Sequence, residues 1–131
     1  MKLTHVRLLV EDTERCLAFY RDALGLEVTL EAGDGIYYEL AAGDVLLALY
    51  RRDLMGQMMG AELPPPAQSD AVAFTFQVHD VDQTCEELRG RGVELVTEPM
   101  DYDVAFLRLA HLRDPEGNLI EINAPLSAPT I

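Results

Sequence analysis

The carboxylate of Glu121 lies within an apolar stretch near the C-terminus, where an isolated charge is strongly disfavoured. It belongs to RDPEGNLIEI, residues 113–122. Pro115 and Gly117 mark a turn, and the apolar residues after them are typical of a buried strand. A carboxylate in such a strand must be paired, bound to a metal ion or wetted by a cavity, because an unpaired buried charge is costly. Burial can also raise the pKa of a carboxylate enough for it to act as a general base.

Two residues near the N-terminus are possible partners for this carboxylate. In LTHVRLLV, residues 3–10, alternation places Val6, Leu8 and Val10 on one face of a strand, and His5 and Arg7 on the other. An imidazole is a common metal ligand, and a guanidinium pairs well with a carboxylate. Glu121 could therefore pair with His5 or Arg7, share a divalent cation with His5, or accept hydrogen bonds from a ligand.

The elements that would position these residues occur twice along the chain. Each half is expected to contain a strand, a helix and three further strands: 3–10, 11–25, 26–31, 36–41 and 44–52, then 71–78, 79–92, 93–98, 103–113 and 118–123. Asp12 or Thr13 can cap the first helix, and Asp80 with Gln83 has the spacing of a capping box. Landmarks match at an offset of 67–68: Val10 with Val78, Asp12 with Asp80, Gly25 with Gly92 and Glu31 with Glu98. The sequence therefore predicts a duplicated β-α-β-β-β module.

One domain of two modules accounts for the whole sequence. We expect module one over 1–52, a linker over 53–70, module two over 71–124 and a tail over 125–131. The linker contains a proline triplet and lacks periodicity. Its Met55, Met58 and Met59 could cover an apolar ligand, although packing over a core edge or a subunit interface is the commoner role.

Composition excludes some kinds of partner. The chain has 131 residues and a formal net charge of −13, which argues against nucleic acid and anionic membranes. No stretch approaches the ~20 apolar residues of a membrane span, and no signal peptide is evident, so we expect a cytoplasmic protein. Cys16 and Cys85 have no metal-binding spacing and are expected to be buried, reduced thiols.

The motifs THVRLLVEDTERCLAFYRDALGLEV and LRDPEGNLIEI, together with the duplication, resemble the vicinal oxygen chelate superfamily. This superfamily includes glyoxalase I, extradiol dioxygenases, methylmalonyl-CoA epimerase, fosfomycin-resistance enzymes and bleomycin-resistance proteins. The resemblance implies an α+β fold in which paired modules form cup-shaped mixed sheets. It also implies a homodimer and a small-molecule pocket in the cup.

The resemblance further implies metal ligands on the first and last strands of each module. The internal repeat assigns these four positions to His5, Leu47, Ala73 and Glu121, of which only His5 and Glu121 carry ligating groups. A catalytic divalent metal usually has three or more protein ligands. His111 is a possible third, although packing is its favoured role. The metal site, for Ni, Zn, Mn or Fe, is therefore expected to be incomplete.

Two functions follow from these expectations. The first is a small-molecule-binding protein of the glyoxalase/bleomycin-resistance type, which would sequester an apolar or cationic compound. The second is a divalent-metal-dependent lyase, isomerase or dioxygenase acting on vicinal oxygens, with Glu121 as the best catalytic candidate. In both cases the expected ligand-binding residues are the same: His5, Arg7, Leu47, Ala73, Thr75, Gln77, His111 and Glu121.

Overall fold

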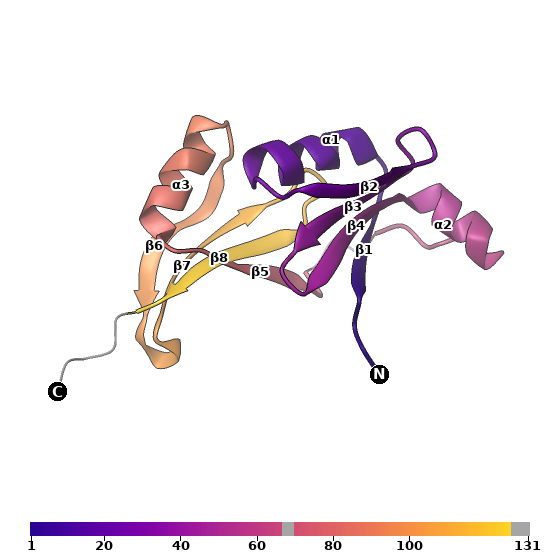
Figure 1. Cartoon of the computed structure of the whole chain (residues 1–131). Coiled ribbons are helices and arrows are strands. Elements are labelled where there is room, and N and C mark those ends of the chain that lie inside the picture. Colours follow the sequence, from indigo (N-terminus) through magenta and orange to yellow (C-terminus); the bar gives the residue numbers. More distant parts are fainter. Residues whose placement is uncertain (67–69, 127–131) are drawn as a thin grey trace. The chain divides into compact units, whose positions relative to one another are not determined.

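The computed structural model describes residues 1–66 and 70–126, and the chain divides into two compact units. The first unit is Met1–Ala67 and the second is Gln68–Ile131. Each contains a four-stranded mixed sheet, and the element order β-α-β-β-β occurs in both. The predicted α+β class with two such modules is confirmed (Figure 1).

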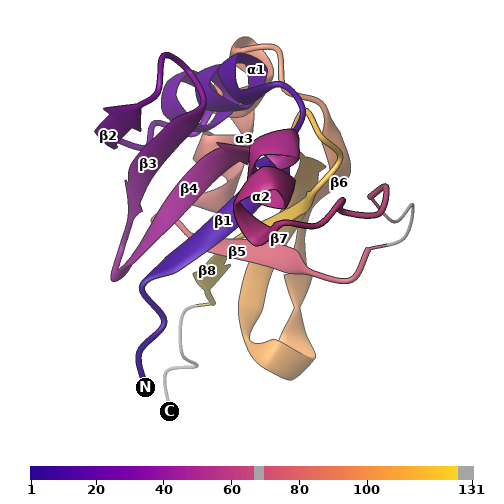
Figure 2. The same ribbon diagram turned by 90° about the vertical axis from the view of Figure 1, so that its right-hand side faces the viewer.

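The first unit has the strand order β1-β4-β3-β2, with β1 parallel to β4 and the other pairs antiparallel. Helix α1 contacts β3 and β4 and lies along one face of the sheet (Figure 1). Helix α2 lies beside β1 and β4 (Figure 2). The elements are β1 (His5–Val10), α1 (Thr13–Leu17), η1 (Ala18–Ala23), β2 (Val28–Ala32), β3 (Tyr37–Ala42), β4 (Val45–Arg51) and α2 (Arg52–Met59).

The first helix begins at a side-chain cap and then widens. The Asp12 carboxylate accepts a hydrogen bond from the Arg15 backbone N–H at 3.0 Å. From Ala18 the helix is a π-helix, in which the Leu24 N–H donates to the Phe19 carbonyl at 3.0 Å. Gly25 follows with a φ of 78°, a left-handed conformation that favours glycine. Asp12 is therefore the cap, of the two residues predicted for that role.

Helix α2 lies at the start of the segment 53–70, which the sequence predicts to be a linker. The helix is formed by RDLMGQMM and ends at Gly60, whose φ is 71°. Gly56 lies so close to the returning chain that a Cβ would meet the Ala61 carbonyl oxygen at 2.8 Å. Packing against β1 and β4 thus supports a short helix that contains a glycine. Residues 67–69 of the expected linker and 127–131 of the tail lie outside the described residues.

The second unit has the strand order β5-β8-β7-β6, with β5 parallel to β8. The Asp80 carboxylate caps its helix by accepting from the Gln83 N–H at 3.0 Å. The Gln83 amide donates to Glu87 instead of returning to the cap, so only half of the capping box forms. The elements are β5 (Ala73–Gln77), α3 (Val81–Gly90), β6 (Leu95–Tyr102), η2 (Asp103–Ala105), β7 (Leu107–Arg113) and β8 (Leu119–Pro125).

One face of each sheet packs against the helix of its own unit. Fully buried side chains on these faces include Leu40 and Leu49 in the first unit, and Leu112 and Ile120 in the second.

Cys16 and Cys85 are free and buried, as predicted, and burial raises the pKa of the Cys85 thiol. None of the helices in the described part of the chain has the length and apolar character needed to cross a bilayer. The opposite faces of the sheets carry the polar side chains.

Candidate functional site

The first polar face consists of His5, Arg7, Tyr37 and Glu39. Arg7 of β1 and Glu39 of β3 are both paired with Ala48 of the intervening strand β4, so all three residues lie in one row across the sheet. Because side chains two positions apart share a face, His5 and Tyr37 point to the same side. This side is opposite to the one that carries Leu8, Val10 and Leu40.

Hydrogen bonds connect the four residues of the first polar face. The His5 Nε2 lies 2.9 Å from the Glu39 Oε2, which also accepts from the Tyr37 hydroxyl at 2.5 Å. The Arg7 Nε donates to the Tyr37 oxygen at 3.3 Å. Burial and the hydrogen bond to Glu39 raise the pKa of Tyr37. The Glu39 side chain is only 14% exposed, and both of these partners contact the same carboxylate oxygen.

The second polar face consists of Thr97, His111, Glu121 and Asn123. His111 of β7 is paired with Thr97 of β6 and with Glu121 of β8, so these three also form a row. The His111 Nε2 lies 3.0 Å from the Glu121 Oε1, and the Asn123 amide donates to the Glu121 Oε2 at 3.0 Å. The Glu121 side chain is 22% exposed. Glu121 is therefore a half-buried carboxylate with partners on both oxygens inside its own unit.

The hydrogen bonds of His111 determine which ring nitrogen carries the proton. The Glu121 carboxylate can only accept, so the neutral His111 ring must donate from Nε2. Its Nδ1 then accepts from the Thr97 hydroxyl at 2.8 Å, while the Thr97 oxygen accepts the His111 backbone N–H at 3.0 Å. The same arrangement occurs at His5, whose Nδ1 lies 2.8 Å from the Thr4 hydroxyl and whose Nε2 faces Glu39. Both imidazoles thus have two engaged nitrogens.

The sequence favours packing for His111, but its ring has polar partners at both nitrogens. Pairing of Glu121 with His5 or Arg7 is one of the alternatives that the sequence leaves open. Within the second unit the partners of Glu121 are His111 and Asn123. Within the first unit His5 contacts Glu39, and Arg7 contacts Tyr37.

The predicted equivalence of Leu47 with Glu121 is wrong by one residue. Leu47 pairs with Val6 and Leu40, is 4% exposed and lies on the face that packs under the helix. The residue of the first unit that is equivalent to Glu121 is Ala48. Ala48 pairs with the third residue of β1, and Glu121 pairs with the third residue of β5. Leu47 is therefore part of the core of the first unit and does not line its polar face.

The remaining predicted residues lie on the edge strand β5 of the second unit. Ala73, Thr75 and Gln77 are exposed, and their backbones pair with Leu119, Glu121 and Asn123 of β8. They share the face of Glu121. Sequence reasoning missed Glu39, although its parity with Tyr37 in the strand 36–41 was an available signal.

The family that the sequence resembles implies a divalent metal, but the donors within each unit are too few. The first unit brings together one imidazole and one carboxylate, and so does the second. Among residues 1–66 and 70–126 no group of three or more His, Cys, Asp or Glu side chains could hold a metal ion. Tightly bound catalytic metals usually need three protein ligands. The residues gathered within either unit do not fit such a centre.

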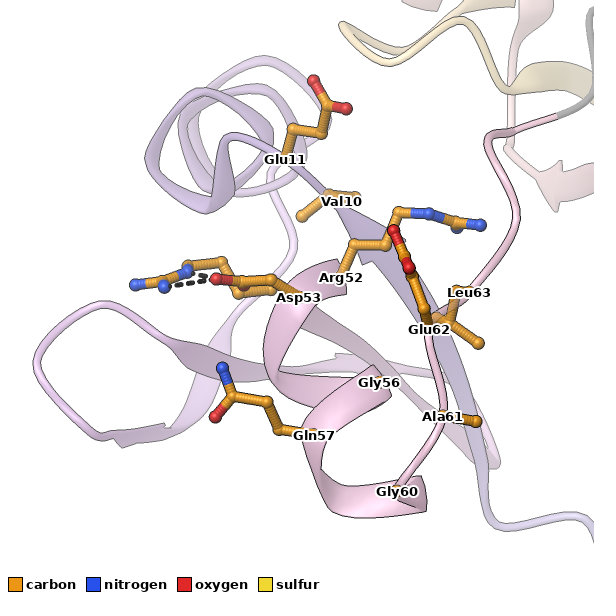
Figure 3. Close-up of a pocket in the computed structure, with 11 residues that line it drawn as sticks. Val10, Glu11, Arg52, Asp53, Gly56, Gln57, Gly60, Ala61, Glu62 and Leu63 are labelled. Atoms are coloured by element: carbon orange, nitrogen blue, oxygen red, sulfur yellow. Dashed lines mark hydrogen bonds and ion pairs between the residues drawn. The ribbon is translucent and has the colours of Figure 1, made fainter.

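A cavity of about 660 Å³ lies elsewhere in the first unit, between helix α2, the segment that follows it and the end of β1 (Figure 3). Arg51 and Asp53 form an ion pair at 2.7 Å beside it, and Arg52 donates to the Pro64 carbonyl. None of the predicted ligand-binding residues lines it. Its lining consists of Val10, Glu11, Arg51, Arg52, Asp53, Gly56, Gln57, Gly60, Ala61, Glu62 and Leu63.

Known proteins share this fold and sequence pattern. Residues 2–122 match the family model of the Glyoxalase/Bleomycin resistance protein/Dioxygenase superfamily. The uncharacterized protein YraH of Bacillus subtilis is 38% identical over 125 residues, which cover 93% of this chain and 97% of YraH. The glutathione transferase FosA of Serratia marcescens is 26% identical over 123 residues, which cover 92% of this chain and 79% of FosA.

Solved structures show the same fold. A glyoxalase/bleomycin resistance protein/dioxygenase from Nocardioides matches with a TM-score of 0.82 and 24% identity, covering 99% of this chain and 87% of its own. The lactoylglutathione lyase of Agrobacterium tumefaciens matches with a TM-score of 0.70 and 22% identity, covering 93% of this chain and 92% of its own. The matching family model, which spans nearly the whole chain, shows that this protein belongs to the glyoxalase/bleomycin resistance protein/dioxygenase superfamily.

Proposed function

We propose that this protein binds a small organic molecule on the polar faces of its sheets and does not depend on a tightly held metal. The observation that supports this function is the pairing within each unit. The imidazole Nε2 atoms of His5 and His111 already face carboxylates at 2.9 and 3.0 Å. A metal bound at either nitrogen would have to displace that contact and would gain at most two donors from the unit.

The ligand would be recognised by hydrogen bonds and by apolar contact. On the first unit, Arg7 and the partly exposed His5 are accessible. On the second unit, Ala73, Thr75 and Gln77 are exposed. Polar groups of this kind among apolar neighbours are typical of small-molecule sites.

A metal-dependent enzyme is the second candidate. It is favoured by two relatives whose names describe enzymes: the glutathione transferase FosA, and a probable lactoylglutathione lyase of Synechocystis that is 25% identical over 129 residues. His5 and Glu121 would be its metal ligands, and Glu121 its catalytic candidate.

Metal analysis separates the two candidates. Protein purified without chelators would be incubated with Ni(II), Zn(II), Mn(II) or Fe(II), desalted and analysed for bound metal. The variants His5→Ala and Glu121→Ala would be compared with His79→Ala, which removes an exposed imidazole outside both polar faces. We expect far less than one metal per chain in every case. One metal per chain that is lost in His5→Ala or Glu121→Ala but kept in His79→Ala would contradict the proposal.

Ligand binding itself is tested by thermal shift and native mass spectrometry with a panel of small organic acids, amines and neutral aromatic compounds. Saturable stabilisation by at least one compound, in the presence of a chelator, is the expected result. A homodimer, which the family resemblance implies, is a further prediction that sedimentation velocity would check.

A further inference from the structure

Arg7 stands apart from most of the arginines of this acidic chain. At a formal net charge of −13, carboxylates are abundant, and five other arginines form ion pairs with them. Arg7 is exposed, and among the described residues its guanidinium forms a hydrogen bond and a ring contact with Tyr37 and no ion pair. The paired arginines are Arg21 with Asp22, Arg51 with Asp53, Arg89 with Glu98, Arg108 with Asp82 and Asp101, and Arg113 with Asp70.

The guanidinium of Arg7 is nevertheless held in place. Its Nε donates to the Tyr37 oxygen at 3.3 Å, and its central carbon lies 5.5 Å from the centroid of the Tyr37 ring. Tyr37 is itself fixed by its hydrogen bond to Glu39 and by an edge-on contact with Tyr50, whose ring centroid is 5.3 Å away. A cation near an aromatic ring is stabilised by the negative face of the ring. The side chain is therefore oriented before any ligand arrives.

The orientation leaves the outer edge of the guanidinium available. Nε is used by Tyr37, whereas Nη1 and Nη2 have no hydrogen-bond partner among the described residues. These two nitrogens can donate in parallel to the two oxygens of a carboxylate or phosphate. Glu39 does not occupy them, because its Oε2 is engaged by His5 and Tyr37. A guanidinium that is held at Nε and has Nη1 and Nη2 available is suited to binding an oxyanion.

We infer that Arg7 binds an oxyanion, a carboxylate or a phosphate group, of the small molecule that this protein recognises. This inference rests on the proposed function and deepens it, because it adds an anionic group to a ligand for which the sequence predicted apolar or cationic character. Because the chain has a net charge of −13, most of its surface repels an anion. Anion binding is therefore expected to be selective for the position of Arg7.

Nuclear magnetic resonance of the arginine Nε–H groups tests the inference with two probes, inorganic phosphate and benzoate. Each would be titrated at a constant ionic strength of about 0.15 M so that screening does not change. Arg7→Gln would be compared with Arg15→Gln, which removes the same charge from an exposed position on α1. Tyr37→Phe keeps the ring and removes the hydroxyl that holds Nε. Unfolding in urea would show that all three variants are folded.

We expect a saturable shift of the Arg7 Nε–H with at least one probe, and the same affinity in Arg15→Gln. Arg7→Gln should weaken binding about tenfold or more, as loss of a charge-assisted bidentate contact would. Tyr37→Phe should weaken it about two- to fivefold. Saturation by phosphate alone identifies a phosphate-type group, and saturation by benzoate alone identifies a carboxylate.

Two results would overturn the inference. One is equal, unsaturated shifts of all exposed arginines with both probes. The other is a ligand found in the compound panel that carries no anionic group and binds Arg7→Gln as tightly as the unaltered protein. In that second case the proposed function would stand while the role of Arg7 would fall. Absence of binding by every compound in the panel would instead contradict the proposed function itself.

Discussion

The two polar faces contain the same chain of groups, a threonine hydroxyl, an imidazole and a glutamate, on different strands. In the first unit the histidine is on β1 and the glutamate on β3. In the second unit the histidine is on β7 and the glutamate on β8. The strand registers make Glu39 and His111 equivalent positions, so the two residue types are exchanged there.

The two units thus contain the same kind of pair at different positions. His5 has Ala73 as its counterpart, and Glu121 has Ala48. In each unit one of these two positions is an alanine, and the polar residue at the other position has a partner on another strand. A carboxylate that is 14% or 22% exposed needs such a partner, because removing it would leave a poorly solvated charge. The shared feature of the two faces is a contact between an imidazole Nε2 and a glutamate, and the strands that supply the two residues differ.

The largest effect is expected where the units are most alike, in their cores. Leu40 and Leu112 occupy equivalent positions, and both are fully buried. Leu40→Ala and Leu112→Ala should each lower the free energy of unfolding by about 2–5 kcal/mol, because each leaves a cavity. Urea unfolding followed by circular dichroism measures this. A cost below about 1 kcal/mol in only one variant would show that the two cores are packed differently.

The second largest effect is expected in the turns before the last strands, where the two units differ. In the second unit the buried Asp114 carboxylate accepts from the backbone N–H groups of Glu116 and Asn118 and from the Asn118 amide. Asp114→Ala should lower the free energy of unfolding by about 2–3 kcal/mol, because these three donors lose a charged acceptor. The exposed Asp44 of the corresponding turn is the control, and Asp44→Ala should change the unfolding free energy by less than about 0.5 kcal/mol. Similar costs for both substitutions would refute this distinction.

Alkaline pH should act through the first unit. The Tyr38 hydroxyl donates to Glu14, and this bond together with burial raises the pKa of Tyr38 from 10.0 to about 12. The protonated Tyr38 hydroxyl therefore stabilises the folded state. This stabilisation is complete below pH 10 and is lost as the pH rises towards 12. The equivalent residue of the second unit is Ala110, which cannot titrate. In urea unfolding between pH 9 and 12, the difference in unfolding free energy between the unaltered protein and Tyr38→Phe should therefore narrow. Tyr102→Phe, at an exposed site, is the control for loss of a tyrosine hydroxyl. A difference for Tyr38→Phe that does not change with pH would contradict this prediction.

The smallest effect concerns the threonines. Thr97→Val removes the donor to the His111 Nδ1 and should cost about 0.5–1.5 kcal/mol, with the ring proton remaining on Nε2 because Glu121 still accepts it. Thr4→Val should act on His5 in the same way. Nitrogen-15 spectra of the imidazoles report which nitrogen is protonated. Protonation of Nδ1 alone, in either histidine, would contradict the hydrogen-bond directions described above.

The duplication and the α+β class were predictable because they depend on local signals. Apolar alternation marks the strands, and the left-handed Gly25 and Gly92 mark the same helix end in each unit. Helix α2 was missed because it is only one short segment, RDLMGQMM, with an internal Gly56, and its packing against β1 and β4 is not visible in the sequence.

The polar faces were harder to predict because they depend on strand register. The internal repeat assigns Leu47 to the position of Glu121 if the glycines of the preceding turns, Gly43 and Gly117, are equivalent. The two turns differ in length, because two residues separate the paired Ala42 and Val45, whereas five separate Arg113 and Leu119. The predicted equivalence was therefore shifted by one residue. A shift of one residue exchanges the two faces of a strand, so Leu47, a core residue, was assigned to the site. Glu39 was missed for a related reason, since its contact with His5 crosses β4 and is invisible in sequence spacing.

The π-helix in the first unit explains an irregularity in the repeat. Thirteen positions separate Asp12 from Gly25, but twelve separate Asp80 from Gly92, although both pairs are a helix cap and a left-handed helix end. The first copy thus contains one residue more between the same two anchors. A bond from each N–H to the fifth preceding carbonyl accommodates that residue without moving either anchor. The difference in length between the two units is therefore accommodated inside a helix and not in a loop.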